Sequence, residues 1–109
     1  MSNDVSLQTD EELRAHLHGE TSKLPWFDLE KHFARGVVFK VAKGTDILDV
    51  AIVMSRDDKD ALQQMIDDKK VLGAEIEDAK NWHESSASFW TVVIAPWVLV
   101  QEIEQKLDS

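Results

Sequence analysis

Cysteine and tyrosine are absent from this 109-residue sequence, which also has only four glycines and two prolines. The lack of cysteine excludes disulfides, thiolate catalysis and cysteine-bound metal sites together. With so few glycines, a phosphate cradle of backbone amides is not expected, and the sequence has no Gly-rich phosphate loop, Gly-x-Ser-x-Gly elbow or His-Glu-x-x-His motif. Several large classes of enzyme are therefore disfavoured from the start.

Basic residues are also scarce, because 12 Lys and Arg stand against 21 Asp and Glu, giving a formal net charge of -9 at pH 7. Such a chain repels phosphate backbones and anionic membrane surfaces, and no basic stripe offsets this. The longest apolar stretch, residues 89–100, contains Pro96 and is shorter than the roughly 20 residues of a membrane-spanning helix. The N-terminus lacks the basic and apolar segments of a secretory signal. We therefore expect a cytoplasmic protein with no nucleic-acid or membrane partner.

The length and the apolar content predict one compact domain. Hydrophobic residues make up 43% of the chain, which is enough for a true core. A chain of about 110 residues leaves no room for a second domain. We expect a flexible N-terminus over residues 1–9 and a single domain over residues 10–107.

The first third of the chain has the pattern of two helices. Thr9 and Glu12 have the spacing of a capping box, and the leucines that follow predict a helix over residues 10–23. Pro25 suits the start of a second helix, because its missing N–H is not needed in the first turn. Gly36 tolerates the left-handed conformation that often ends a helix.

The middle and the end of the chain have the pattern of strands. Residues 37–42 and 47–54 alternate in side-chain direction around a short turn at 43–46, which predicts an antiparallel hairpin. Residues 89–94 are apolar on both alternating faces, which predicts a strand buried on both sides. Pro96 cannot donate a ladder hydrogen bond, so pairing should stop or bulge there.

The remaining segments have the pattern of helices. A cap at 55–58 introduces one helix, a shorter helix covers 76–84, and residues spaced by four favour a last helix over 98–107. The expected order is α-α-β-β-α-α-β with this C-terminal helix. The fold class is then α+β, a three-stranded, mostly antiparallel sheet packed with helices. The order in which the strands pair stays open.

Histidines and carboxylates give only weak candidate sites. Glu12, His16 and Glu20 are spaced by four on one helix face and suit weak binding of a divalent cation. Glu–His pairs at this spacing also commonly stabilise a solvent-exposed helix, which is the interpretation we favour. The other acidic clusters lack the glycine and final glutamate of a calcium loop. We expect no metal, no cofactor and no catalytic residue, and we lean toward a protein that is not an enzyme.

The four tryptophans are the unusual feature of this sequence, and two of them follow proline, at Pro25-Trp26 and Pro96-Trp97. Tryptophan buries a large area and dominates binding hot spots, but in a small domain its first use is core packing. If the two Pro-Trp segments met in the fold, they would form an aromatic-walled groove with a polar rim. The candidate ligand-binding residues are Glu20, Thr21, Trp26, Trp97 and Gln101.

Two segments carry a resemblance to a known family. "ETSKLPWFDLEKHFARGVV" and "FWTVVIAPWVLVQ" are similar to the bacterial family called domain of unknown function 2288. The resemblance covers about Leu13 to Gln101, and the closing motif, residues 95–101, matches closely in order and spacing. The family brings no activity that carries over. The resemblance implies a shared pattern that contains Glu20, Thr21, Trp26, Trp82, Trp90, Pro96, Trp97 and Gln101.

The residues together favour a non-catalytic binding or protein-interaction module, with a protein partner or self-association. The alternative is a small-ligand or metal-binding domain, with or without enzymatic activity, centred on the two Pro-Trp segments. Convergence of Glu20, Trp26, Trp97 and Gln101 on one solvent-reachable pocket would favour this alternative.

Overall fold

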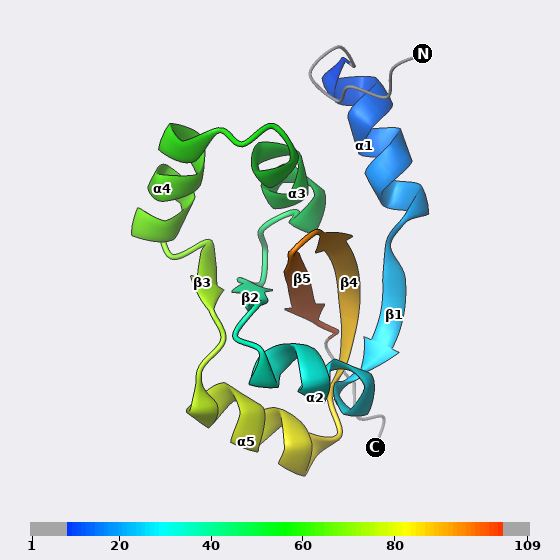
Figure 1. Ribbon diagram of the computed structural model, residues 1–109, viewed down its shortest axis with the longest axis vertical. Helices are drawn as coiled ribbons and strands as arrows, with labels where there is room; N and C mark the ends of the chain where they lie inside the picture. The colour runs from blue at the N-terminus through cyan, green and yellow to red at the C-terminus, as the bar shows by residue number, and fades with distance from the viewer. Residues whose placement is uncertain (1–8, 104–109) are drawn as a thin grey trace.

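The computed structural model describes residues 9–103, which form five helices and five strands (Figure 1). The helices are α1 (Asp10–Gly19), α2 (Trp26–Ala34), α3 (Ile47–Ser55), α4 (Lys59–Asp67) and α5 (Ile76–Ser85). The strands are β1 (Ser22–Pro25), β2 (Val38–Val41), β3 (Val71–Gly73), β4 (Ser88–Ile94) and β5 (Trp97–Glu102). Residues 1–8 of the expected flexible N-terminus and residues 104–107 of the expected last helix lie outside the described residues.

The five strands form one mixed sheet in the order β1-β4-β5-β2-β3. β2 and β5 run parallel, and the other three neighbouring pairs are antiparallel. The α+β class is confirmed, but the three-stranded sheet is wrong, because β1, β3 and β5 were not expected. β4 is a central strand that pairs with β1 and β5. Its predicted burial on both faces holds only in part, because Trp90 is 44% exposed and Val93 is 59% exposed.

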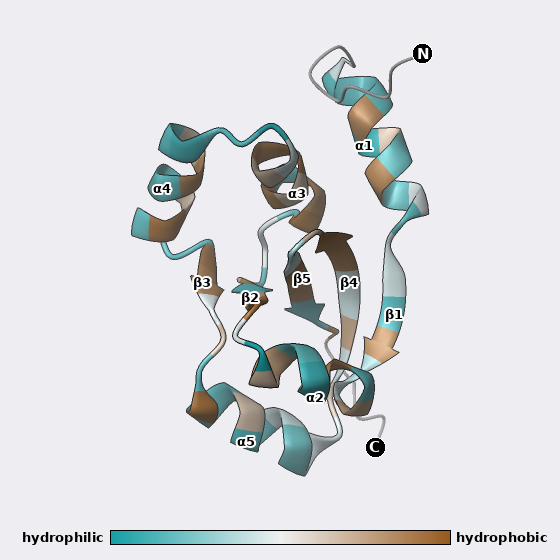
Figure 2. Cartoon of the chain, in the orientation of Figure 1, coloured by the Kyte–Doolittle hydropathy of each residue, from teal (hydrophilic) through white to brown (hydrophobic). Residues whose placement is uncertain are grey.

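The predicted hairpin is also wrong, because its second half is helix α3 rather than a strand. The side chain of Asp46 accepts a hydrogen bond from the backbone N–H of Leu48 at 2.9 Å and so caps this helix. α3 is apolar almost throughout (Figure 2), and an apolar run fits a strand pattern as well as a helix pattern. Its buried residues nevertheless follow a helical spacing: Ile47, Leu48, Val50 and Ala51.

The first and the last predicted helices each include residues that form a strand in the structure. α1 ends at Gly19, and residues 22–25 pair with β4 as β1, so the helix expected over 10–23 is too long. The helix expected over 98–107 is wrong at its start, where β5 pairs with β4 and β2. Residues 98–100 are at most 3% exposed, because β5 is covered on both faces. A strand of this kind has a continuous run of apolar residues, and such a run also fits the spacing of a helix.

The helix boundaries that rest on capping chemistry are confirmed. Thr9 and Glu12 form the expected capping box, with hydrogen bonds of 3.0 and 3.1 Å. Asp58 caps α4 through the backbone N–H of Ala61 at 3.1 Å. Gly36 has a φ of +75°, the left-handed conformation expected after α2. Side-chain caps are local, so sequence spacing is enough to predict them.

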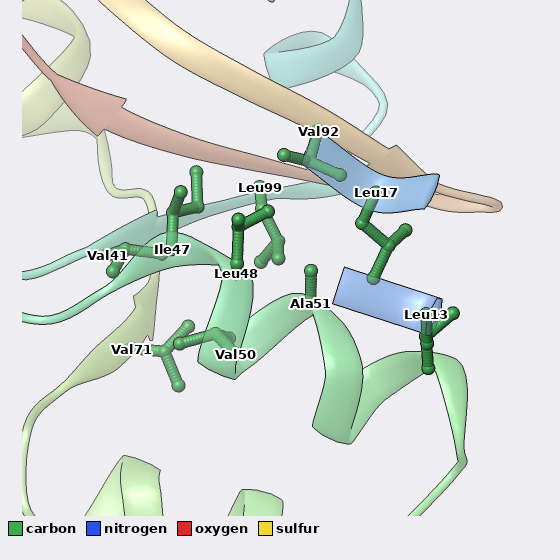
Figure 3. Close-up of a cluster of buried hydrophobic side chains, with 10 residues drawn as sticks. All are labelled: Leu13, Leu17, Val41, Ile47, Leu48, Val50, Ala51, Val71, Val92 and Leu99. Atoms are coloured by element: carbon green, nitrogen blue, oxygen red, sulfur yellow. The ribbon is translucent and has the colours of Figure 1, made fainter. Parts of the chain in front are cut away.

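Two hydrophobic clusters lie on opposite faces of the sheet. Leu99 belongs to one cluster and its neighbours Val98 and Val100 belong to the other, and successive strand residues point to opposite faces. The first cluster joins α1 and α3 to the sheet, and Figure 3 shows Leu13 and Leu17 facing α3. The second joins α2 and α5 to the other face. A side chain can therefore be assigned to one face or the other.

Candidate functional site

The first Pro-Trp segment is held in place at the start of α2. Pro25 is the residue before the helix and has an extended backbone, with φ -79° and ψ 160°. The backbone N–H of Trp26 donates a hydrogen bond to the carbonyl of Ala87 at 2.8 Å. This bond ties the beginning of α2 to the segment that joins α5 to β4.

The side chain of Trp26 packs in the core between α2 and α5 and is 5% exposed. Its ring centroid lies 5.7 Å from that of Phe33 and 5.4 Å from that of Trp82. Trp82 in turn contacts Phe89 edge-on at 4.8 Å. Tilted and edge-on pairs of this kind are favourable beyond the area that they bury. Trp26 therefore serves mainly packing, and little of its surface is left for other contacts.

Trp26 is also among the residues that line a surface groove, which we call the Phe27 groove. Its volume is about 340 Å³, and it lies where the start of α2 meets the end of α5. The side chain of Phe27 is 80% exposed on its rim, the highest exposure of any large hydrophobic residue in the described part of the chain. The lining residues are Pro25, Trp26, Phe27, Glu30, His83, Ser86 and Ala87.

The rim of the Phe27 groove carries one acidic and one basic group. Oε2 of Glu30 lies 3.9 Å from Nδ1 of His83, and both side chains are exposed. The contact is an ion pair only when the imidazole is protonated. Glu30 thus offers a carboxylate at the edge of an apolar, aromatic surface.

The second Pro-Trp segment lies on the opposite face of the sheet. Trp97 shares the face of Leu99 and contacts Phe39 edge-on, with ring centroids 5.3 Å apart. The cavity beside Trp97, between it and the α3–α4 connection, has a volume of only about 60 Å³. Pockets for small molecules usually exceed about 300 Å³. The structure therefore does not bring Trp26 and Trp97 together.

The polar candidates from the sequence line neither the Phe27 groove nor the cavity beside Trp97. Glu20 is the C-cap residue of α1 and is exposed, and the hydroxyl of Thr21 donates to the carbonyl of Leu17 at 2.9 Å. The side-chain amide of Gln101 donates to the carbonyls of Ala42 at 2.9 Å and Thr45 at 2.6 Å. Thr21 and Gln101 therefore satisfy backbone carbonyls at the end of a helix and in a turn.

The ionisable groups of residues 9–103 form no cluster of three or more histidine, aspartate or glutamate side chains with metal-binding geometry. One carboxyl group is clearly perturbed: the hydrogen bond from the Leu48 amide, helped by Arg14, lowers the pKa of Asp46. That carboxylate caps α3 and lies outside the Phe27 groove. No helix within the described residues is both long and apolar enough to cross a membrane.

Sequence reasoning did not single out Phe27 or Glu30, which are exposed and line the groove. A signal for Phe27 was present. Trp26, Leu29 and Phe33 form the buried stripe of α2 at steps of three and four, and a residue one position after Trp26 is rotated by about 100° from that stripe. The approach of α5 to this position is a tertiary contact that local spacing cannot predict.

This arrangement defines a small α+β domain with a five-stranded mixed sheet, helices on both faces and an aromatic surface groove. The chain belongs to the family described as "Protein of unknown function (DUF2288)", whose model matches residues 12–102. It is similar to PA1075 from Pseudomonas aeruginosa, known from an NMR solution structure, with 30% identity, 99% of each chain covered and a TM-score of 0.76. A comparison with curated proteins gave no match.

Proposed function

We propose that this chain is a non-catalytic protein-interaction module and that the Phe27 groove is its docking surface. One observation carries this assignment: an aromatic side chain that is 80% exposed stands at the rim of a groove with Pro25, Trp26 and Ala87 in its lining. Burying an exposed Phe side chain stabilises a complex by about 1.5–3 kcal/mol. Aromatic anchors beside such a groove are typical of interaction hot spots.

The chemistry of the groove indicates what the partner presents. An apolar side chain of the partner would contact Phe27 and Pro25, and a basic side chain beside it would pair with Glu30. The net charge of -9 also favours a cationic partner and opposes a second copy of the same chain. The proposed ligand is therefore a segment of another protein with adjacent apolar and basic residues.

Selection from a library of displayed random peptides tests this proposal. The wild-type protein is the target, and a synthetic copy of the enriched peptide is then titrated into wild type, Phe27→Ser and Ile76→Ser. Ile76 is the matched control, because it is 70% exposed at the start of α5 and does not line the groove. We expect Phe27→Ser to weaken binding at least about tenfold, since loss of the ring removes about 1.5–3 kcal/mol of burial.

Ile76→Ser should bind the peptide like wild type. Equal losses in the two variants, or no peptide enriched by the wild type, would contradict the assignment of the groove. Size-exclusion chromatography with light scattering measures the oligomeric state. If the wild type is a dimer and Phe27→Ser is a monomer, the groove binds a second copy of this chain and not a segment of another protein.

A second candidate function is binding of a small ligand at the first Pro-Trp segment. The observation in its favour is the volume of about 340 Å³, which falls within the usual range for small-molecule pockets. A thermal-shift screen with metals, nucleotides and common metabolites distinguishes this function from peptide docking, because a specific ligand raises the melting temperature by linkage. A ligand whose shift disappears in Phe27→Ser would favour this candidate.

We further propose that the module works in the bacterial cytoplasm. The complete lack of cysteine suits a reducing compartment, where disulfides do not form. Fractionation of cells that carry a tagged chain tests this location, and recovery with the periplasmic fraction would contradict it.

A further inference from the structure

A second and larger groove lies between α1, α3 and α4, and we call it the acidic groove. Its volume is about 500 Å³. The first hydrophobic cluster joins α1 and α3 to the sheet on the face opposite to α2 and α5, so this groove is remote from Phe27. Its apolar lining comes from two helices and consists of Ile52, Val53 and Met65.

The apolar side of the acidic groove is incompletely covered. α4 has an apolar stripe at Leu62, Met65 and Ile66, yet not one of its residues is buried. The stripe packs against the first cluster with only part of its surface. An amphipathic helix normally buries its apolar face, so α4 retains apolar surface that a further element can cover.

The rim of the acidic groove carries an excess of carboxylates. The lining carboxylates are Asp10, Glu11 and Asp49, and Asp46 lies outside the lining as an ion-pair partner of Arg14. Arg14 pairs with Asp46 at 2.9 Å and with Asp49, and Arg56 pairs with Asp10 at 3.0 Å. The lining residues and their ion-pair partners together hold four carboxylates and two guanidinium groups, which leaves a local charge of about -2 in a chain whose net charge is -9.

We propose that the acidic groove receives a basic amphipathic helix of a partner protein. The apolar residues of such a helix would cover Ile52, Val53 and Met65, and its lysines or arginines would face the rim. This is the usual arrangement in which a helix lies in a groove, with apolar anchors on one face. Charge complementarity selects the basic helix and disfavours an acidic or neutral one.

Two synthetic peptides test this proposal. Both are helices of about 18 residues with the same leucines on one face, because shorter peptides are marginal helices in water. One carries lysines on the other face and its twin carries glutamates. Fluorescence anisotropy measures the affinity of each peptide for the protein. We expect the lysine peptide to bind far more tightly than its twin, and its affinity to fall as the salt concentration rises. Equal binding of the two peptides would overturn the proposal.

Charge-reversal variants separate the groove from the general acidity of the chain. Glu11→Lys acts at the rim, in the first turn of α1, and Glu77→Lys makes the same change in the first turn of α5, away from the groove. We expect Glu11→Lys to lower the affinity for the lysine peptide about tenfold and Glu77→Lys to have little effect on it. Equal losses in both variants would overturn the site.

The apolar side has a similar pair of variants. Met65→Gln should lower the affinity for the lysine peptide, whereas Ile76→Gln, at an exposed position of α5, should leave it unchanged. Far-ultraviolet circular dichroism confirms that each variant is folded. Binding that survives Met65→Gln unchanged would contradict docking in the groove. Phe27→Ser should leave this binding unchanged, so the second site can fail or succeed independently of the first.

Discussion

Gln101 illustrates how a residue that looks functional in the sequence can have a structural task. Its side-chain amide donates to two backbone carbonyls, those of Ala42 and Thr45, and so joins β5 to the turn between β2 and α3. The turn carbonyls would otherwise lose a protein partner in a partly buried place. A buried acceptor left without a partner costs about 1–3 kcal/mol.

Replacement of Gln101 by methionine should therefore destabilise the protein. Gln101→Met keeps the length of the side chain and removes both donors, so we expect the free energy of unfolding to fall by about 1–3 kcal/mol in urea denaturation. Gln64→Met is the matched control, because the amide of Gln64 makes only an exposed bond to Asp68 at 3.2 Å. That control should change stability by less than about 0.5 kcal/mol. Equal small effects would contradict the structural task.

Single residues were predictable from the sequence where their partners are near in the chain. The capping pair Thr9 and Glu12, and the position of Gly36 after α2, follow from spacing alone. The partners of Gln101 lie 59 and 56 positions away. A local sequence pattern cannot show a contact over that separation, so the sequence predicted Gln101 as a ligand-binding candidate and not as a donor to this turn.

At the scale of elements, α3 shows where pattern and packing diverge. Four of its nine residues are the β-branched Val or Ile, which favour a strand on propensity. Burial against α1 and the sheet, together with the Asp46 cap, outweighs that preference. A run that is apolar on every side has no periodicity, and the helix is then decided by tertiary contacts and its cap.

The cap of α3 predicts a dependence of stability on pH. The amide of Leu48, and secondarily Arg14, lowers the pKa of Asp46 below its ordinary value of 3.8. A carboxyl group with a lowered pKa in the folded state stabilises the protein above its ordinary pKa, and this contribution is lost as the pH falls through the lowered value. Asp46→Asn keeps a capping oxygen but removes the charge.

We expect Asp46→Asn to be less stable than wild type at neutral pH, by no more than about 1 kcal/mol, because the carboxylate is half exposed and screened by solvent. The two proteins should converge in stability as the carboxyl group of the wild type becomes protonated. Urea denaturation at a series of pH values measures both curves. A difference that persists or grows in acid would contradict the assignment.

At the scale of the whole molecule, the sheet separates two surfaces with different chemistry. α2 and α5 cover one face and carry the Phe27 groove at their meeting point (Figure 1). α1, α3 and α4 lie on the other and carry the acidic groove. The α+β class was predictable, because it needs only the kinds of element in the chain. The pairing of β5 with β2 and β4 was not, and it is this pairing that separates Trp26 from Trp97.

The tryptophan side chains provide the most direct test of the docking surface. Trp26 lines the Phe27 groove, whereas Trp97 lies on the other face and Trp90 is 44% exposed on the face that Trp97 shares. Their indole N–H groups give separate signals in a nitrogen–proton correlation spectrum. Titration with the peptide selected on the wild-type protein should shift the signal of Trp26 and leave those of Trp90 and Trp97 unchanged. A shift of Trp97 with no shift of Trp26 would contradict the account.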